Sequence, residues 1–324
     1  MRALVALFTA LAAMSAAAFD LQGHRGARGL APENTLPAFA AALSLGVSTL
    51  ELDVGVTADG VVVIAHDRRL NPDITRDVAG NWLAHPAPTI RSLTFTQLQG
   101  YDVGRIKPGI TYEKRYPQQK AMDGVRMPRL ADLFAMLERS GNKSVRLNIE
   151  TKLSPLAPEE TLDPKAFAAA LIGVVRAVRM EARVTVQSFD WRSLKAVQKL
   201  APAVATSCLT AQQRWQDNIG AGDPAGSPWV AGFRLKDHGS IPRMVKAAGC
   251  STWSPYFGEI DKATVVEAQA LGLKVLPWTV NEPAHLRAVL DLGVDGLITD
   301  RPDLGREALA ERGLALPASS PVQP

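Results

Sequence analysis

Charge of one sign is nowhere concentrated in this 324-residue sequence. Its 36 Lys and Arg residues are interleaved with 32 Asp and Glu residues, so the net charge of +4 is spread over a mixed surface. A nucleic-acid-binding protein is expected to gather basic residues on one face or in a tail, so the pattern argues against such a partner. A hydrophobic content of 47% is typical of a soluble globular chain, large enough for one large domain or two small ones.

The motifs of three common enzyme classes are also missing. The sequence contains no G-x-x-x-x-G-K-[ST], G-x-G-x-x-G or G-x-S-x-G string, so nucleotide-binding, dinucleotide-binding and serine-hydrolase functions have no support. Histidine is scarce, at five residues. Of these, His85, His238 and His285 lack the spacing of zinc ligands, so no His-rich zinc site is predicted.

Long apolar runs are absent beyond the first 18 residues, MRALVALFTALAAMSAAA. This run has a positive start at Arg2, an apolar core and a small-residue A-x-A site, which is the pattern of a signal peptide cleaved near Phe19. The core is shorter than the ~20 residues that span a bilayer. We therefore expect a periplasmic or secreted protein without stable membrane insertion after signal cleavage; an uncleaved anchor is the alternative.

Cysteine is limited to Cys208 and Cys250. An exported protein could join them. However, Cys208 comes late in one predicted strand and Cys250 opens the next, which would place the thiols at opposite ends, beyond the reach of a bridge. The sequence leaves the pairing open and favours two buried free thiols without a catalytic role.

What the sequence does contain is an alternation of short β-branched runs with amphipathic helices. Leu36, Phe39, Ala40 and Leu43, for example, repeat at i, i+3, i+4 and i+7, as in a helix packed on a sheet. The regularity favours a (β/α)8 TIM barrel over a doubly wound open sheet. The predicted strands are Leu21–His24, Ser48–Val54, Ser144–Thr151, Arg183–Phe189, Val204–Leu209, Ser251–Tyr256, Lys274–Val280 and Asp295–Thr299. The predicted helices are Leu36–Leu45, Leu130–Glu138, Lys165–Val178, Trp191–Leu200, Ile241–Ala248, Lys262–Leu271 and Ala284–Leu292.

Two segments depart from this alternation. Val61–His66 reads as an extra strand that an Asp59-Gly60 turn returns against the second barrel strand. Residues 68–127 are long, polar and broken by prolines, and loops of this length are usually functional. We therefore predict a single domain over residues 19–324, with a cap at about 68–127 inserted over the barrel mouth, where active sites of such barrels lie.

Acidic side chains recur at two strand ends. Glu51 and Asp53 are spaced i and i+2, so both point to one side of an otherwise apolar strand. Glu150 and Lys152 repeat the spacing on the next barrel strand. Three carboxylates at adjacent strand ends suit a hard divalent cation, Ca²⁺ or Mg²⁺. A salt-bridge cluster with Lys152 and Arg25 fits the spacing equally well.

Two histidines, His24 and His66, end strands beside the same acids. A pair of imidazoles can divide general-base and general-acid work near neutral pH. Arg25 follows His24 and precedes Gly26, which allows a close backbone approach or a positive φ. Arg25 and Lys152 together would form a cationic cradle for a phosphate.

Several short sequence motifs, taken in their order along the chain, resemble those of a known protein family. The sequence contains HRG (24–26), PENT (32–35), ELDV (51–54), HD (66–67), NIETK (148–152), QSFD (187–190), WTVN (278–281) and DGLITDRP (295–302). In this order they resemble the glycerophosphodiester phosphodiesterase family over nearly the whole mature chain. The resemblance implies a barrel with a capping insertion after the second strand, in agreement with the pattern of elements.

The resemblance also implies roles for individual residues. Metal ligands fall on Glu51, Asp53 and Glu150, and catalytic residues on His24 and His66. Phosphate contacts fall on Arg25 and Lys152, and a wall of the substrate pocket on Trp278, which would otherwise be a core tryptophan. Gln187 and Ser188 would contact ligand or form buried hydrogen bonds, and Asp67 would support the mouth.

The implied reaction is metal-dependent hydrolysis of a glycerophosphodiester to sn-glycerol 3-phosphate and an alcohol, with substrate preference residing in the cap. Two alternatives stay open. One is a lysophospholipase D-type phosphodiesterase of the same barrel superfamily, which needs an apolar acyl groove. The other is a periplasmic protein that binds phosphorylated ligands without catalysis, which would not need two histidines at the mouth.

Overall fold

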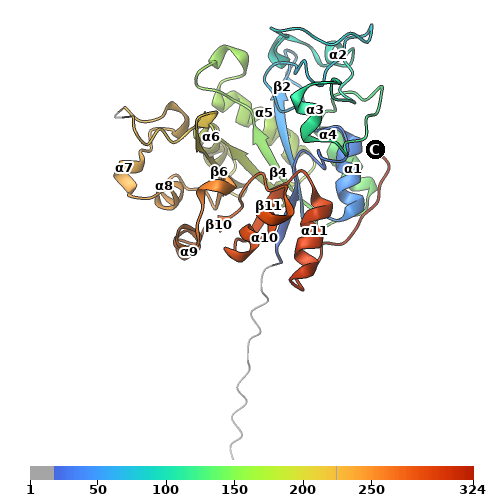
Figure 1. Ribbon diagram of the computed structural model, residues 1–324. Helices are drawn as coiled ribbons and strands as arrows, with labels where there is room; N and C mark the ends of the chain where they lie inside the picture. The colour runs from blue at the N-terminus through green and yellow to red at the C-terminus, as the bar shows by residue number, and fades with distance from the viewer. Residues whose placement is uncertain (1–17, 224) are drawn as a thin grey trace, which may run out of the picture.

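The computed structural model describes residues 18–223 and 225–324. Parallel strands curve around a central axis with helices outside them (Figure 1), in the order β10-β9-β6-β5-β4-β2-β1-β11. Each predicted barrel strand is present, with shifted ends. The strands are β1 (Asp20–Gly23), β2 (Thr49–Val56), β4 (Arg146–Thr151), β5 (Val184–Ser188), β6 (Ala205–Thr210), β9 (Thr252–Pro255), β10 (Lys274–Val275) and β11 (Gly296–Thr299).

Backbone hydrogen bonds join the two ends of this sheet. Ile298 N–H donates to the Pro277 carbonyl at 2.9 Å, and Val280 N–H donates to the Ile298 carbonyl at 2.9 Å. The strand that was predicted to run to Val280 forms a regular ladder only up to Val275, because Pro277 has no N–H to donate. The fold is therefore the predicted (β/α)8 barrel, and the open doubly wound sheet is excluded.

The outer helices follow the predicted stripes. In α1 (Leu36–Leu45), Phe39 and Leu43 are buried against the sheet, and the Thr35 side chain accepts from the Ala38 N–H at the first turn. The helix α11 was not predicted. The remaining long helices are α4 (Leu130–Arg139), α5 (Pro164–Ala177), α6 (Trp191–Leu200), α8 (Ile241–Ala247), α9 (Lys262–Ala270), α10 (Pro283–Asp291) and α11 (Pro302–Glu311).

The segment between β3 (Val62–Ile64) and α4 lies outside the barrel. β3 pairs antiparallel with β2, with Val63 opposite Gly55, so the predicted hairpin strand is present. Beyond it, α2 (Phe95–Leu98) and α3 (Thr111–Arg115) lie above one side of the barrel (Figure 1). The segment has its own apolar cluster, formed by Val63, Ala65, Leu70, Ala87, Ile90, Leu98 and Met127. We refer to residues 68–127 as the cap.

A second irregular segment follows β6, on the opposite side of the barrel from the cap. It contains a short hairpin, β7 (Gln212–Gln213) and β8 (Gln216–Asp217), and the helix α7 (Leu235–His238). Isolated 3-10 turns complete the described elements. They are Ile90–Ser92, Pro158–Glu160, Glu181–Arg183, Pro228–Val230 and Phe257–Glu259.

The prediction of free thiols is wrong, because Cys208 and Cys250 form a disulfide with a Cα–Cα distance of 5.9 Å. Cys208 lies on β6, but Cys250 does not extend the neighbouring β9. It lies in the turn after α8, where Gly249 has a φ of +80° and the Cys250 N–H donates to the Val245 carbonyl. Strand register therefore does not govern the distance between the two sulfur atoms.

The predicted signal peptide, residues 1–18, falls outside the described part of the chain except for its last residue. Within the described residues, none of the helices combines the length and the apolar character needed to cross a membrane.

Candidate active site

Three buried carboxylates on β2 and β4 lie close together. Glu51 and Asp53 project from β2, and Asp53 lies opposite Glu150 in the parallel register. One oxygen from each of the three lies within 4.8 Å of the others, an arrangement that could hold a metal ion. The three residues therefore lie together, as the sequence predicted. Glu51 and Asp53 share one face of β2 because they are spaced i and i+2, and Glu150 lies opposite Asp53 on the neighbouring strand.

Two cations contact the acids. Lys152 Nζ donates to Glu150 Oε1 at 2.8 Å and lies 3.6 Å from Asp53 Oδ1, while Arg25 Nε lies 3.5 Å from Asp53 Oδ2. Burial works against the charge of Lys152, but Glu150 and Asp53 raise its pKa above the usual value. Both predicted cradle residues are therefore present and charged at the barrel mouth.

The loop after β1 is held in an unusual backbone conformation. Arg25 has a φ of +50°, and its N–H donates to Glu51 Oε2 at 2.9 Å. Gly26 has a φ of +86°, and a Cβ there would lie 2.6 Å from the Ala38 carbonyl carbon, so only glycine fits. Backbone strain of this kind persists where the surrounding structure enforces it, often at functional sites.

Burial and mutual repulsion disfavour negative charge on two of the three acids when no cation is bound. Burial, Asp53 and Glu150 raise the pKa of Glu51 well above its ordinary value. Burial also raises the pKa of Glu150 to about 7, and Asp53 adds to this shift while Lys152 opposes it. Among the described residues, no hydrogen-bond donor reaches the buried Asp53 Oδ1. An all-oxygen donor set of mutually repelling acids, with one oxygen that accepts no hydrogen bond from the described residues, fits a hard divalent cation.

Both predicted histidines line the same cavity as Glu51 and Glu150. His24 Nε2 lies 3.8 Å from Glu51 Oε2, and His66 Nε2 lies 3.1 Å from Lys152 Nζ. The second nitrogen of His66 contacts Asp67 Oδ1 at 2.8 Å, which agrees with a supporting role for Asp67. Burial and the nearby Arg28 lower the pKa of His24 to about 4, so its imidazole is neutral at pH 7.

Gln187 and Ser188 on β5 form buried hydrogen bonds. Gln187 Nε2 donates to Glu51 Oε1 at 2.7 Å and so fixes one of the carboxylates, while Gln187 also lines the cavity. Ser188 Oγ donates to the Thr151 carbonyl at 3.0 Å and accepts from the Asp190 N–H. Ser188 therefore belongs to the barrel wall.

Sequence reasoning missed several charged residues of the site. Glu33 Oε1 accepts from Arg25 Nη1 at 2.5 Å, and the Tyr112 hydroxyl of the cap donates to the other oxygen of Glu33. Arg28 and Asp300 lie beside His24. Glu33 belongs to the PENT string and Asp300 to DGLITDRP, so motif membership was a usable signal for these two, whereas Tyr112 carries no local signal.

The cavity at the mouth has a volume of about 840 Å³, and its two sides differ. We call the side built by His24, Arg25, Arg28, Glu51, His66, Glu150 and Lys152, together with Asp53 beneath them, the charged half. We call the side built by Phe189, Trp215, Trp229, Tyr256, Phe257 and Trp278 the aromatic half. The ring centroids of Trp215 lie 5.6 Å from Tyr256 and 6.0 Å from Trp278, so the rings form one continuous wall.

Trp278, the predicted pocket residue, is part of this wall. Its indole Nε1 donates to the Ser254 carbonyl at 2.9 Å, which fixes the ring, and the residue is half-buried. Trp215 at the tip of the β7–β8 hairpin is 61% exposed and was not predicted. The hairpin thus extends the aromatic half beyond the barrel strands.

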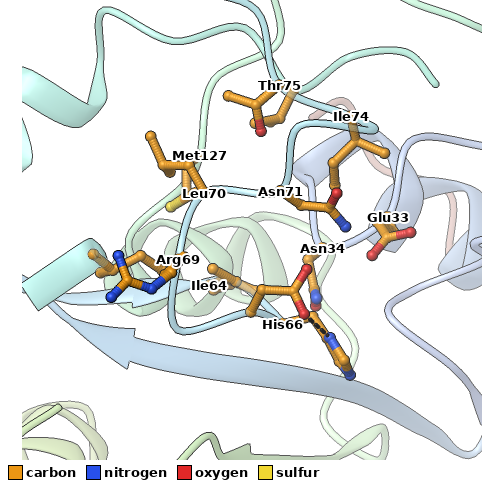
Figure 2. Close-up of a pocket in the computed structure, with 14 residues that line it drawn as sticks. Glu33, Asn34, Ile64, His66, Arg69, Leu70, Asn71, Ile74, Thr75 and Met127 are labelled. Carbon is orange, nitrogen blue, oxygen red and sulfur yellow. Dashed lines mark hydrogen bonds and ion pairs between the residues drawn. The ribbon is translucent and has the colours of Figure 1, made fainter. Parts of the chain in front are cut away.

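A second, smaller cavity lies behind His66, beneath the cap (Figure 2). Ile64 and His66 line it from the barrel side, while Leu70, Ile74 and Met127 line it from the cap side. Its volume is about 30 Å³, close to the space of one or two water molecules. The cap therefore rests directly against the residues that flank His66.

Comparison with known proteins gives the family of this chain. Residues 24–304 match the family described as the glycerophosphoryl diester phosphodiesterase family. A glycerophosphodiester phosphodiesterase from Caldanaerobacter subterraneus subsp. tengcongensis is 28% identical over 280 residues, which cover 86% of this chain and 93% of that protein.

Similar solved structures are also described as phosphodiesterases. A protein from Silicibacter pomeroyi, provisionally described as a glycerophosphoryl diester phosphodiesterase, superposes with a TM-score of 0.82 at 35% identity over 93% of this chain and 96% of that one. A phosphodiesterase from Oleispira antarctica, solved in complex with the product sn-glycerol-3-phosphate, shares the fold at 22% identity and a TM-score of 0.65, over 90% of this chain and 96% of that one. The chain therefore belongs to the glycerophosphoryl diester phosphodiesterase family, a family of phosphodiester hydrolases.

Proposed function

We propose that the protein hydrolyses glycerophosphodiesters to sn-glycerol 3-phosphate and an alcohol, with one divalent cation, Ca²⁺ or Mg²⁺, and two histidines. The observation that carries the proposal is the convergence of Glu51, Asp53 and Glu150 within 4.8 Å, beside both His24 and His66. Family membership supports a small phosphodiester as substrate.

In this proposal Glu51, Asp53 and Glu150 hold the cation. When bound, a divalent cation supplies Lewis-acid stabilisation of a phosphoryl oxygen. Arg25 and Lys152 add fixed positive charge at the same mouth, which offsets negative charge that develops on the phosphate in the transition state. Their ion pairs with Glu33 and Glu150 keep both side chains in place before substrate arrives.

The two histidines divide the proton transfers. One imidazole removes the proton from the attacking glycerol 2-hydroxyl as the new P–O bond forms, and the other gives a proton to the departing alkoxide as its P–O bond breaks, which leaves a cyclic phosphate. A water molecule then opens the cyclic phosphate to sn-glycerol 3-phosphate. Each ring has one nitrogen bound to a carboxylate, Asp300 for His24 and Asp67 for His66, and directs its second nitrogen toward the charged half. A binding protein without catalysis has no use for this arrangement, which disfavours that alternative.

The cap and the aromatic half bear on substrate choice. The cap contributes Tyr112, Arg115 and Tyr116 to the cavity lining, so we propose that it selects among substrates together with the aromatic half. The wall at Trp215 and Trp278 offers apolar surface beyond the phosphate position. A lysophospholipid acyl chain is the competing occupant of that surface.

A head-group panel tests reaction, metal need and specificity together. Enzyme treated with chelator is incubated with glycerophosphocholine, glycerophosphoethanolamine or lysophosphatidylcholine, and Ca²⁺ or Mg²⁺ is added back separately. We expect sn-glycerol 3-phosphate and alcohol in equal amounts from the first two substrates, and only after a cation is restored. Faster turnover of lysophosphatidylcholine would favour the lysophospholipase D alternative, and binding without alcohol release would revive the binding protein.

We also propose that the protein is exported, as a periplasmic or secreted enzyme. The apolar leader with its A-x-A site supports this, and so does the Cys208–Cys250 disulfide, because disulfides persist mainly in oxidising compartments. Cell fractionation with an antibody to the protein, combined with N-terminal sequencing, tests it. A product that starts at Met1 in the cytoplasmic fraction would contradict the proposal.

A further inference from the structure

The last barrel strand brings a buried carboxylate against His24. β1 and β11 pair in parallel, with Gly23 opposite Thr299, so the next residues along the two strands, His24 and Asp300, lie side by side. Asp300 is 1% exposed, and its Oδ1 lies 2.6 Å from His24 Nδ1. The distance is that of a strong charge-assisted hydrogen bond.

The carboxylate of Asp300 is held rigidly. Arg28 donates from Nε to Oδ1 at 2.8 Å and from Nη2 to Oδ2 at 3.0 Å, a two-point contact. Asn281 donates to Oδ2 at 2.7 Å and accepts from the Asp300 N–H at 2.9 Å. Although burial opposes the charge, Arg28 and His24 hold the pKa of Asp300 well below its usual value, so it is ionised.

This environment selects one tautomer of His24. A lone pair on Nδ1 would face an ionised oxygen at 2.6 Å, so Nδ1 must carry the hydrogen. Arg28 Nη2 has a second hydrogen besides the one it donates to Asp300 Oδ2, and it lies 3.1 Å from Nδ1, but Asp300 Oδ1 is closer to Nδ1, at 2.6 Å, and as an ionised oxygen it can only accept. The neutral ring therefore presents an unprotonated Nε2, and Nε2 is the atom that faces Glu51 and the cavity.

We propose that Asp300 is a positioning residue that fixes the orientation and the Nδ1–H tautomer of His24, with Arg28 and Asn281 holding the carboxylate in place. During turnover the proton moves between His24 Nε2 and a substrate oxygen, while the Nδ1 hydrogen stays on the ring. The catalytic consequence rests on the proposed phosphodiesterase function; the tautomer does not.

The test compares Asp300→Asn with a matched control, Asp190→Asn. Asp190 is also fully buried and bound to an arginine, Arg192, but it caps helix α6 and does not line the cavity. For Asp300→Asn we expect kcat for glycerophosphocholine to fall by about 10²–10⁴-fold with little change in KM, since an amide supports the wrong tautomer. Asp190→Asn is expected to lower thermal stability and keep kcat.

A spectroscopic readout separates positioning from activity. The chain has five histidines, so ¹⁵N-histidine spectra are simple enough to assign His24 by comparison with His24→Gln. We expect an Nδ1–H ring at neutral pH in the wild type and a gain of the Nε2–H form in Asp300→Asn. If the latter does not fold, Asn281→Ala, which leaves the carboxylate but removes one donor, is expected to lower kcat by about 10-fold.

The outcomes are distinct. An Nε2–H ring in the wild type, unchanged kcat in Asp300→Asn, or an equal loss of kcat in Asp190→Asn would overturn the role of Asp300. A wild-type enzyme that shows the Nδ1–H ring but releases no alcohol from any glycerophosphodiester would instead refute the proposed function and leave the positioning inference standing.

Discussion

The charged half and the aromatic half of the mouth are built on different strands of the barrel and are held by different forces. In the charged half, residues on and after β1, β2 and β4 carry ionisable groups whose positions depend on hydrogen bonds and ion pairs at 2.5–3.8 Å. In the aromatic half, residues that follow β5, β9 and β10, together with Trp215 of the β7–β8 hairpin, form edge-to-face or tilted ring contacts with centroids 5–6 Å apart. Directional contacts position reacting groups, whereas packed aromatic rings offer a broad surface that tolerates different ligands.

The largest effect should come from the two histidines of the charged half. We expect His24→Ala and His66→Ala each to lower kcat by about 10²–10⁴-fold, because each removes a proton-transfer group. Circular dichroism and thermal melting check that the barrel is intact. Near-normal turnover in either folded variant would contradict the assignment, and His85→Ala, a change in the cap that removes a histidine outside the cavity lining, serves as the matched control.

The second largest effect is expected from changing a carboxylate of the candidate metal site. Glu51→Gln keeps the size of the side chain and removes one charge from the candidate metal site. We expect the rise in melting temperature on adding Ca²⁺ or Mg²⁺ to chelated wild-type protein to disappear in the variant, because stabilisation follows ligand affinity. Turnover should fall with it. A variant with an unchanged thermal response would show that the cation binds elsewhere.

In the aromatic half we expect a smaller effect of a different kind. Trp215→Ala removes the exposed ring at the tip of the hairpin, so KM for the substrate should rise several-fold, by about 1 kcal/mol of binding, while kcat changes little. Trp215→Phe should restore most of the affinity. Leu156→Ala, which shortens another exposed apolar residue that does not line the cavity, is the control. If Trp215→Ala lowered kcat as much as His24→Ala, the proposed division between a charged half for catalysis and an aromatic half for binding would be wrong.

The smallest effect on activity is expected from the Cys208–Cys250 disulfide, which braces β6 and the turn before β9 behind the aromatic half. The bridge closes a loop of 42 residues, so replacing both cysteines by serine should lower the free energy of unfolding by about 4 kcal/mol. Urea denaturation measures this change. Activity at 25 °C should be kept, and a matching loss in kcat would show that the brace also shapes the site.

The sequence was a good guide wherever the deciding contact is local. The i, i+2 spacing placed Glu51 and Asp53 on one face, and the 3.6-residue stripe placed α1 on the barrel. It failed where the contact joins distant segments. His24 and Asp300 are 276 positions apart, and Tyr112 reaches Glu33 across 79 positions from a segment without periodicity.

The same limit explains the other errors. The Cys208–Cys250 pairing depends on the turn after α8, and an analysis of predicted strands alone does not describe that turn. Trp215 lies in a two-residue hairpin turn within an irregular stretch, so neither a period of two nor one of 3.6 marks it. Non-local closure of the barrel, rather than local propensity, decides these positions.

The place of β1 between β2 and β11 has a consequence for how the chain becomes active. The first strand to leave the ribosome obtains its second neighbour only when the last strand has been made, because the His24 N–H bonds to the Thr299 carbonyl. A product truncated before residue 296 would retain all three candidate metal ligands and both histidines, yet it would lack β11 and the Asp300 carboxylate that contacts His24. Under the proposed function, the His24 imidazole would therefore be held in place only after the whole polypeptide has been made.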